Sequence, residues 1–386
     1  MNKVAIPYSR QSIDEDDRKA VLRVLKSDYL TQGPEVENFE TKISTFCKVK
    51  YGVALNSATS ALHASCNALG IGSEDTVWTV PITFVASANC ALYCNAQIDF
   101  VDIDPNTFCI CPKKLEEKLK LHKSTNKSLP SLLIVVHLGG QSCEMEKIYK
   151  LSIQYSFKII EDASHALGSF YKSKRVGSCQ FSDVAVFSFH PVKTITSGEG
   201  GIAVTNSKKI ANKIEDFRSH GIVKDQDRFL KPSDTPWYYE QQSLGFNYRL
   251  SDIHAALGSS QLNKIEKFEI QRNTIRRKYI KELKDLVVFQ TLPKECISAN
   301  HLFIIRVPQS KHKSIFINLR NKGILVGLHY MPVHLNPFYK KLGFKEGLFP
   351  ESEKYAKEAI SLPLYPNLSD SSFSYIIKNL KINLLL

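Results

Sequence analysis

The stretch VAVFSFHPVKTITSGEGGIAV, residues 184–204, places one lysine between two apolar runs. The first run has the length and the β-branched and aromatic content of a buried strand, and a second run follows the paired glycines. Lys193 lies in the turn between them. A lysine directly after a buried strand is partly removed from water, which lowers its pKa and frees its amine as a nucleophile. An ordinary surface charge is the alternative for one of 51 basic residues.

Strand-like runs of this kind alternate with helical patterns through the first two thirds of the chain. Amphipathic stretches such as 60–69 and 144–156 separate them. The alternation predicts an α/β domain in which helices cover a mostly parallel mixed sheet. The runs lie at residues 52–55, 76–80, 98–103, 132–137, 157–162, 184–189 and 201–206.

The pattern changes after residue 207 and predicts a second, smaller α+β unit. Helical stretches at 207–219 and 251–287 flank a polar, aromatic loop at 224–242. They are followed by HLFIIRVP, by a helix candidate at 311–322, and by GILVGLHYMPVH. We expect a large cofactor-binding domain and a small C-terminal domain, over residues 1–250 and 251–386.

The composition argues against several classes of protein. Nine scattered cysteines, with no paired CxxC motifs, predict neither a disulfide framework nor a metal site. No apolar run approaches the roughly 20 residues of a membrane span, and no signal peptide is visible, so we expect a cytoplasmic protein. The net charge of +13 is spread along the chain without interleaved aromatics, so we expect no nucleic-acid partner. The excess of positive charge suits the binding of small anionic ligands.

Asp162 ends the apolar run in FKIIEDASHALGS, residues 157–169. It should therefore lie at the carboxyl end of a strand, where open α/β sheets place their ligand crevice. A buried carboxylate needs a cationic or hydrogen-bonding partner, and the pyridinium nitrogen of pyridoxal phosphate is such a partner. A helix N-cap is the alternative role.

Two more stretches suit a phosphorylated, planar cofactor. In ALNSATSALHASCNAL, a short strand is followed by small residues and a helix, so the amides near Ala58 and Thr59 can face an anion. In VPITFVASANCAL, Phe84 follows a strand, where its ring can stack on a planar group. The same residues also occur as helix caps and as core phenylalanines.

The order of these motifs resembles the pyridoxal-phosphate-dependent nucleotide-sugar aminotransferases of the DegT type, which have the fold type I aminotransferase architecture. The resemblance spans nearly the whole chain. The motifs are YLTQGPEVENFE, NSATSALHA, PITFVASAN, FVDID, VVHLGGQ, EDASHALGS, SFHPVKTITSGEGG, RSHGI, GFNYRLSDIHAALG, HYMPVH and SLPLYPNLS.

The resemblance implies a role for each matching residue. Lys193 corresponds to the lysine that bonds covalently to the cofactor and moves a proton, and Asp162 to the partner of the pyridine nitrogen. His165 stands where the family often has a glutamine beside the cofactor ring or its hydroxyl. The remaining implied roles are ring stacking by Phe84, phosphate binding by Ala58, Thr59 and Ser188, a phosphate contact by Asn247 of a partner subunit in a homodimer with shared active sites, and substrate binding by Leu30, Thr31, Arg249, His329 and Tyr330.

The finer resemblance concerns the substrate. The histidine in DASHALGS, together with NSATSALH, is most similar to aminotransferases of pseudaminic acid biosynthesis. These install a C4 amine from L-glutamate, which becomes 2-oxoglutarate, on a UDP-linked 2-acetamido-2,6-dideoxy-4-keto hexose. Open alternatives are another UDP-, GDP- or dTDP-keto sugar, as in bacillosamine or perosamine formation. A non-catalytic regulatory protein that binds pyridoxal phosphate is the alternative from a different class.

Overall fold

A seven-stranded sheet forms the centre of the molecule in the computed structural model, which describes residues 5–385. The strand order is β2-β10-β9-β6-β5-β3-β4, and all strands are parallel except β10, which is antiparallel to both of its neighbours. All seven lie at the predicted runs, so the predicted mixed, mostly parallel sheet is confirmed. Their bounds are β2 (Tyr51–Leu55), β3 (Thr76–Thr79), β4 (Gln97–Phe100), β5 (Leu132–Val136), β6 (Lys158–Asp162), β9 (Val184–Ser188) and β10 (Gly201–Thr205).

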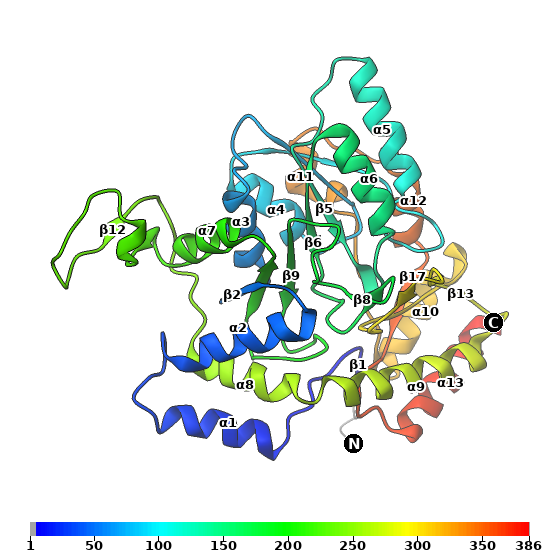
Figure 1. The fold of residues 1–386 in the computed structure, drawn as a ribbon. Helices are drawn as coiled ribbons and strands as arrows, with labels where there is room; N and C mark the ends of the chain where they lie inside the picture. The colour runs from blue at the N-terminus through cyan, green and yellow to red at the C-terminus, as the bar shows by residue number, and fades with distance from the viewer. Residues whose placement is uncertain (1–4, 386) are drawn as a thin grey trace.

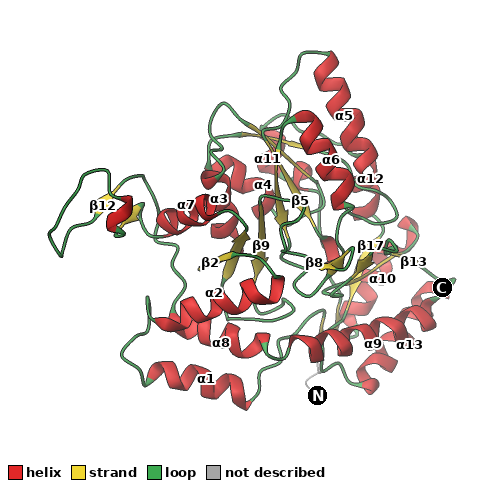
Figure 2. Cartoon of the chain, in the orientation of Figure 1, coloured by secondary structure: helices red, strands yellow, loops and turns green. Residues whose placement is uncertain are grey.

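Helices cover both faces of this sheet, as Figures 1 and 2 show. On β9, Val184 and Val186 pack toward one layer of helices, while Ala185 and Phe187 pack toward the other. Because both faces are buried, the strands are continuously apolar, which is why the sequence pattern found them. The first layer is α3 (Ala58–Ala68), α4 (Ala86–Tyr93) and α7 (Lys208–Arg218); the second is α2 (Pro34–Cys47), α5 (Pro112–Ser124), α6 (Met145–Tyr155) and α8 (Asp252–Leu262).

The C-terminal part forms a separate hydrophobic core around a three-stranded sheet. The N-terminal strand β1 pairs with β16 in this region. Helix α8, in contrast, packs on the large sheet. The expected domain boundary near residue 250 stays a prediction. The elements are β1 (Ile6–Pro7), α9 (Ile265–Leu283), β13 (Val288–Phe289), β15 (Phe303–Arg306), α10 (Gln309–Asn321), β16 (Ile324–Leu325), β17 (Ala359–Leu362) and α13 (Asp370–Leu385).

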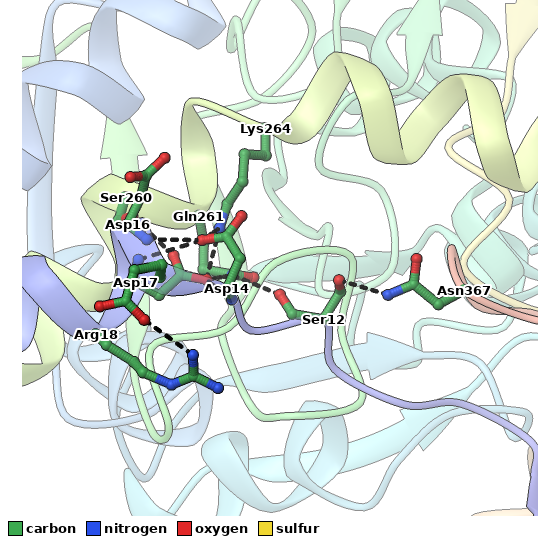
Figure 3. Close-up of polar contacts among 10 residues, drawn as sticks. Ser12, Asp14, Asp16, Asp17, Arg18, Ser260, Gln261, Lys264 and Asn367 are labelled. Carbon is green, nitrogen blue, oxygen red and sulfur yellow. Dashed lines mark hydrogen bonds and ion pairs between the residues drawn. The ribbon is translucent and has the colours of Figure 1, made fainter.

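The helical stretch predicted at 251–287 consists of two helices, because the chain turns between α8 and α9 at Asn263 and Lys264. Lys264 leaves the helical path and donates from Nζ to the buried carboxylate of Asp17, at 2.5 Å. Asp17 also accepts from Ser260 and Gln261, both at 2.7 Å (Figure 3). This contact set fixes α1 (Glu15–Leu25) against the helix junction.

The predicted loop at 224–242 is an arm that projects away from the body of the molecule (Figure 1). Two short strands, β11 (Ile222–Val223) and β12 (Glu240–Gln241), join at its base. Leu230 and Trp237 on the arm are 77% and 80% exposed. The remaining elements are β7 (Phe170–Tyr171), β8 (Lys174–Arg175), β14 (Cys296–Ile297), α11 (Pro337–Lys341) and α12 (Pro350–Ala356).

Within residues 5–385, none of the helices has both the length and the apolar character needed to cross a bilayer.

Candidate active site

A cavity of about 390 Å³ opens at the carboxyl ends of the parallel strands. Val136, Asp162 and Ser188, the last residues of β5, β6 and β9, all line it. Its size lies within the range of small-molecule sites, and its walls are mainly apolar with a few polar groups. Nine of the thirteen predicted site residues line this cavity: Ala58, Thr59, Phe84, Asp162, His165, Ser188, Lys193, His329 and Tyr330.

Lys193 lies in the turn after β9, where its backbone N–H donates to the carbonyl of His190 at 2.9 Å. The neighbouring carbonyl of Val192 accepts from Ser9 Oγ at 2.7 Å, so the N-terminal segment holds this turn. Burial lowers the pKa of Lys193 to about 8, against the opposing attraction of Asp162. Among residues 5–385, no carboxylate lies within ion-pair distance of the Lys193 amine. Roughly a tenth of the amine is therefore neutral, and nucleophilic, at pH 7, far more than for an exposed lysine.

Asp162 is 6% exposed and is held by two neutral donors. Ser87 Oγ donates to Oδ2 at 2.6 Å, and the backbone N–H of Ser164 donates to Oδ1 at 3.1 Å. Within the described part of the chain, no cation forms an ion pair with this buried carboxylate. A positively charged group of a ligand is the partner that such a site lacks.

The N-terminus of α3 supplies an anion cradle. Ser57 caps the helix, and Ser60 N–H donates to its Oγ at 3.1 Å, whereas the amides of Ala58 and Thr59 have no acceptor within the helix. Gly201 of β10 makes this position possible, because a Cβ there would lie 2.3 Å from Ala58 N. The helix end can therefore sit directly on the sheet and face the cavity.

Phe84 is 56% exposed, and its ring borders the cavity. Tyr330 lies beside it, with ring centroids 6.1 Å apart. An exposed aromatic face next to an amine, a carboxylate and an anion cradle suits a planar, phosphorylated ligand that bears a cationic nitrogen. The residues present therefore fit pyridoxal phosphate.

His165 and His329 are buried, neutral histidines. Burial and the nearby Lys193 and His329 hold the pKa of His165 well below its usual range. Burial and Lys193 lower the pKa of His329 to about 4, and its Nδ1 lies 2.9 Å from Ser361 Oγ. Neither ring carries a positive charge at neutral pH.

Sequence reasoning missed Tyr8 and Ser87. Tyr8 lines the cavity and packs against His329, with ring centroids 4.7 Å apart. It comes from the N-terminal segment, which carries no motif. Ser87 donates to Asp162, and a buried serine near the start of the mostly apolar helix α4 was the available signal.

Four predicted residues lie outside the cavity of their own chain. Asn247 forms an isolated β-bridge with Ser219, and Thr31 forms one with Ser251. Leu30 is 48% exposed. Arg249 borders a second cleft, between α2, α7 and the arm. Within a single chain, these four residues do not line the cavity.

The profile of the DegT/DnrJ/EryC1/StrS aminotransferase family matches residues 11–381. The chain belongs to this family. It is 41% identical over 375 residues to the UDP-4-amino-4,6-dideoxy-N-acetyl-beta-L-altrosamine transaminase of Campylobacter jejuni subsp. jejuni serotype O:23/36, and the match covers 95% of each sequence.

Solved structures agree with this assignment. Helicobacter pylori PseC, an aminotransferase involved in the biosynthesis of pseudoaminic acid, is 33% identical with a TM-score of 0.90 over 99% of both chains. The putative sugar aminotransferase Spr1654 from Streptococcus pneumoniae, in its PLP form, is 26% identical with a TM-score of 0.88, also over 99% of both chains. The predicted sugar aminotransferase family and fold are confirmed, and pyridoxal phosphate is confirmed as a cofactor at the level of the family.

Proposed function

We propose that this chain binds pyridoxal 5'-phosphate in the cavity and transfers an amino group from L-glutamate to C4 of a UDP-linked 2-acetamido-2,6-dideoxy-4-keto hexose. One observation carries the chemical part of the proposal. Among residues 5–385, a lysine amine without an ion pair, a buried carboxylate without a cation, and a pair of helix amides without an acceptor in their helix all face one cavity.

Each of these groups has a distinct task. Asp162 binds the ring nitrogen and holds its proton, because the buried carboxylate gains a cationic partner there. Ala58, Thr59 and Ser188 bind the phosphate, and Phe84 covers the ring. Lys193 would bond to the cofactor through its amine and, when that amine is free, would hold or move a proton at Nζ. When bound, pyridoxal phosphate supplies an electron sink for the carbon that loses its proton.

The substrate assignment rests on likeness. The Campylobacter relative carries the altrosamine transaminase name, and the Helicobacter structure is described as acting in pseudoaminic acid biosynthesis. Both match the chain over almost its full length. Another UDP-, GDP- or dTDP-keto sugar remains an alternative substrate, and a regulatory protein that binds the cofactor without turnover remains the alternative function.

The proposal includes a homodimer in which each cavity is completed by its partner. Asn247 is expected at the partner's cavity, and we extend this placement to Leu30, Thr31 and Arg249, because all four lie outside the cavity of their own chain. The exposed apolar residues Leu230 and Trp237 of the arm are the kind of surface that such an interface covers.

The activity is tested with ¹⁵N-labelled L-glutamate and a panel of UDP-, GDP- and dTDP-linked 4-keto sugars, read by mass spectrometry. We expect the label in a UDP-amino sugar. Preferred amination of a GDP or dTDP sugar would replace the substrate assignment. Bleaching of the bound cofactor by glutamate without any labelled sugar would contradict it, and a cofactor that glutamate leaves unchanged would favour the regulatory protein.

The shared cavity is tested by mixing Lys193→Ala with Asn247→Ala, each assayed alone beforehand as its own baseline, after dissociation and reassociation. One of the two cavities in the mixed dimer then has both wild-type residues, so we expect activity to return to roughly a quarter of the wild-type level, since about half of the dimers are mixed. No recovery, in a mixture shown to exchange subunits, would contradict the shared site.

A further inference from the structure

A directed chain of hydrogen bonds ends at the cavity wall. The backbone N–H of Gly139, just after β5, donates to His165 Nδ1 at 3.3 Å. His165 Nε2 lies 3.1 Å from Tyr330 Oη, and the Tyr330 ring lines the cavity. Both ring nitrogens of His165 are therefore engaged by the protein, although the glutamine that often stands at this position in the family was expected to face the cofactor.

The direction of this chain is fixed by chemistry. A backbone N–H can only donate, so His165 Nδ1 must carry a lone pair. His165 is neutral, because burial and its positive surroundings hold its pKa well below the usual range. Its single ring proton is therefore on Nε2, and that proton points at Tyr330 Oη. The Tyr330 oxygen is the acceptor in this contact.

The hydroxyl proton of Tyr330 is consequently free for a ligand. Within residues 5–385, His165 is the one hydrogen-bonding partner of this hydroxyl. Burial raises the pKa of Tyr330, so the hydroxyl stays protonated across the physiological range. His301, which is 2% exposed, packs its ring against that of His165 with centroids 4.5 Å apart and limits its rotation.

We propose that His165 is a positioning residue that fixes the Tyr330 hydroxyl as a hydrogen-bond donor to an oxygen of the ligand in the cavity. This inference rests on the proposed function. A neutral donor of fixed direction stabilises negative charge that develops on the accepting oxygen. That oxygen belongs either to the phenolic group of the cofactor or to the sugar, and the experiment below separates the two.

The test compares four single variants and one double variant. Tyr330→Phe removes the donor alone. His165→Gln keeps both functions, because its amide oxygen can accept from Gly139 while its amide nitrogen donates to Tyr330, whereas His165→Leu keeps neither. Tyr339→Phe is the matched control, since its hydroxyl donates to Asn89 Oδ1 at 2.6 Å and does not line the cavity.

The measured quantities are the visible absorbance of the protein loaded with pyridoxal 5'-phosphate, its pH dependence, the cofactor Kd, and kcat and KM for the UDP-4-keto sugar. If the acceptor is the cofactor oxygen, Tyr330→Phe and His165→Leu shift the absorbance or its pH midpoint before any sugar is added. If the acceptor is on the sugar, the spectrum is unchanged and kcat/KM falls by roughly 10- to 100-fold. His165→Gln should restore most of what His165→Leu loses, and Tyr339→Phe should change nothing.

The double variant separates a positioning role of His165 from a role in packing alone. Because His165 acts through Tyr330, the double variant His165→Leu/Tyr330→Phe should be no worse than Tyr330→Phe alone. Wild-type behaviour of Tyr330→Phe in both spectrum and kinetics, or multiplicative losses in the double variant, would overturn the inference. If His165→Leu does not fold, Tyr330→Phe and the rescue by His165→Gln still decide it. Failure of the wild type to load with the cofactor would instead remove the proposed function, and this inference with it.

Discussion

The cavity at the strand ends and the cleft between α2, α7 and the arm are both lined by charged residues, but their charges are arranged differently. The cleft, at about 710 Å³, is the larger of the two. In it, Arg218 contacts Glu40 at 2.6 Å, and Arg228 pairs with Asp216. In the cavity, the Lys193 amine and the Asp162 carboxylate each face open space without an ion-pair partner in the described chain. The active site is therefore identified by its unpaired buried charges and not by its volume. A ligand is the partner that such charges lack.

The largest expected effect comes from removing the amine. Lys193→Ala should lower transamination to below about 10⁻⁴ of the wild-type rate, because no other lysine of the described chain lines the cavity to replace it. The cradle and Asp162 remain, so the variant should still bind pyridoxal phosphate noncovalently. Steady-state assays and equilibrium dialysis measure the two effects. Appreciable turnover by the variant would assign the chemistry to a different residue.

The second largest effect is expected from Asp162→Asn. The amide keeps the shape: its oxygen can accept from the Ser164 N–H, and its nitrogen can donate to Ser87 Oγ. It carries no charge, however, to hold a protonated ring nitrogen. We expect kcat to fall by roughly 10²–10³ while the fold is retained. Ser87→Ala is the graded control, since it removes one donor and leaves the charge. A near-normal rate for Asp162→Asn would show that another group tunes the cofactor.

A substitution in the cleft should lower the stability of the protein and leave catalysis unchanged. Arg218→Met leaves Glu40 without its cation, and burial already raises the pKa of Glu40 against the opposing effect of Arg218. We expect a loss of about 3 kcal/mol in the free energy of unfolding at pH 7, with cofactor affinity unchanged. Because the raised pKa favours the neutral acid, the deficit should shrink as the pH falls and Glu40 takes up a proton.

The matched control for this variant adds Glu40→Gln, which removes the unpaired charge and keeps an acceptor for Ala54 N–H. The double variant should recover much of the lost stability in urea unfolding. A selective loss of cofactor binding in Arg218→Met would break the comparison, because it would place the cleft in the active site.

The smallest effect is a shift in the reactivity of one amine. In the cofactor-free protein, burial sets the pKa of Lys193 at about 8, whereas a fully exposed lysine titrates near 10.5. Competitive acetylation read by peptide mass spectrometry should show Lys193 reacting with a midpoint near pH 8. Since Asp162 raises this pKa, Asp162→Asn should move the midpoint lower. A midpoint near 10.5 would contradict the desolvated site.

The strands and the central site residues were predictable because their signals are local. A strand buried on both faces is largely apolar; Asp162 ends one such strand, and Lys193 lies in the turn after another. Tyr8 was not predictable, because Ser9 joins it to the catalytic turn across 183 residues of sequence. The break at Lys264 depends on Asp17, which is 247 residues away. Contacts of this kind leave no periodic pattern for a single sequence to reveal.

His165 shows the same limit of sequence-based prediction, here for a residue that was predicted. Its motif placed it beside the cofactor, but only the structure shows that Gly139 and Tyr330 engage both of its nitrogens. The identity of the residue was readable, whereas the direction of its hydrogen bonds was not.

The most direct test of the central claim is the visible absorbance of the purified protein with pyridoxal 5'-phosphate, before and after L-glutamate is added. We expect a yellow band that requires Lys193 and that glutamate bleaches, because the unpaired amine in the cavity is the group that bonds to the cofactor and is displaced by the donor. A protein that forms no such band, or that forms it equally well as Lys193→Ala, would contradict the account.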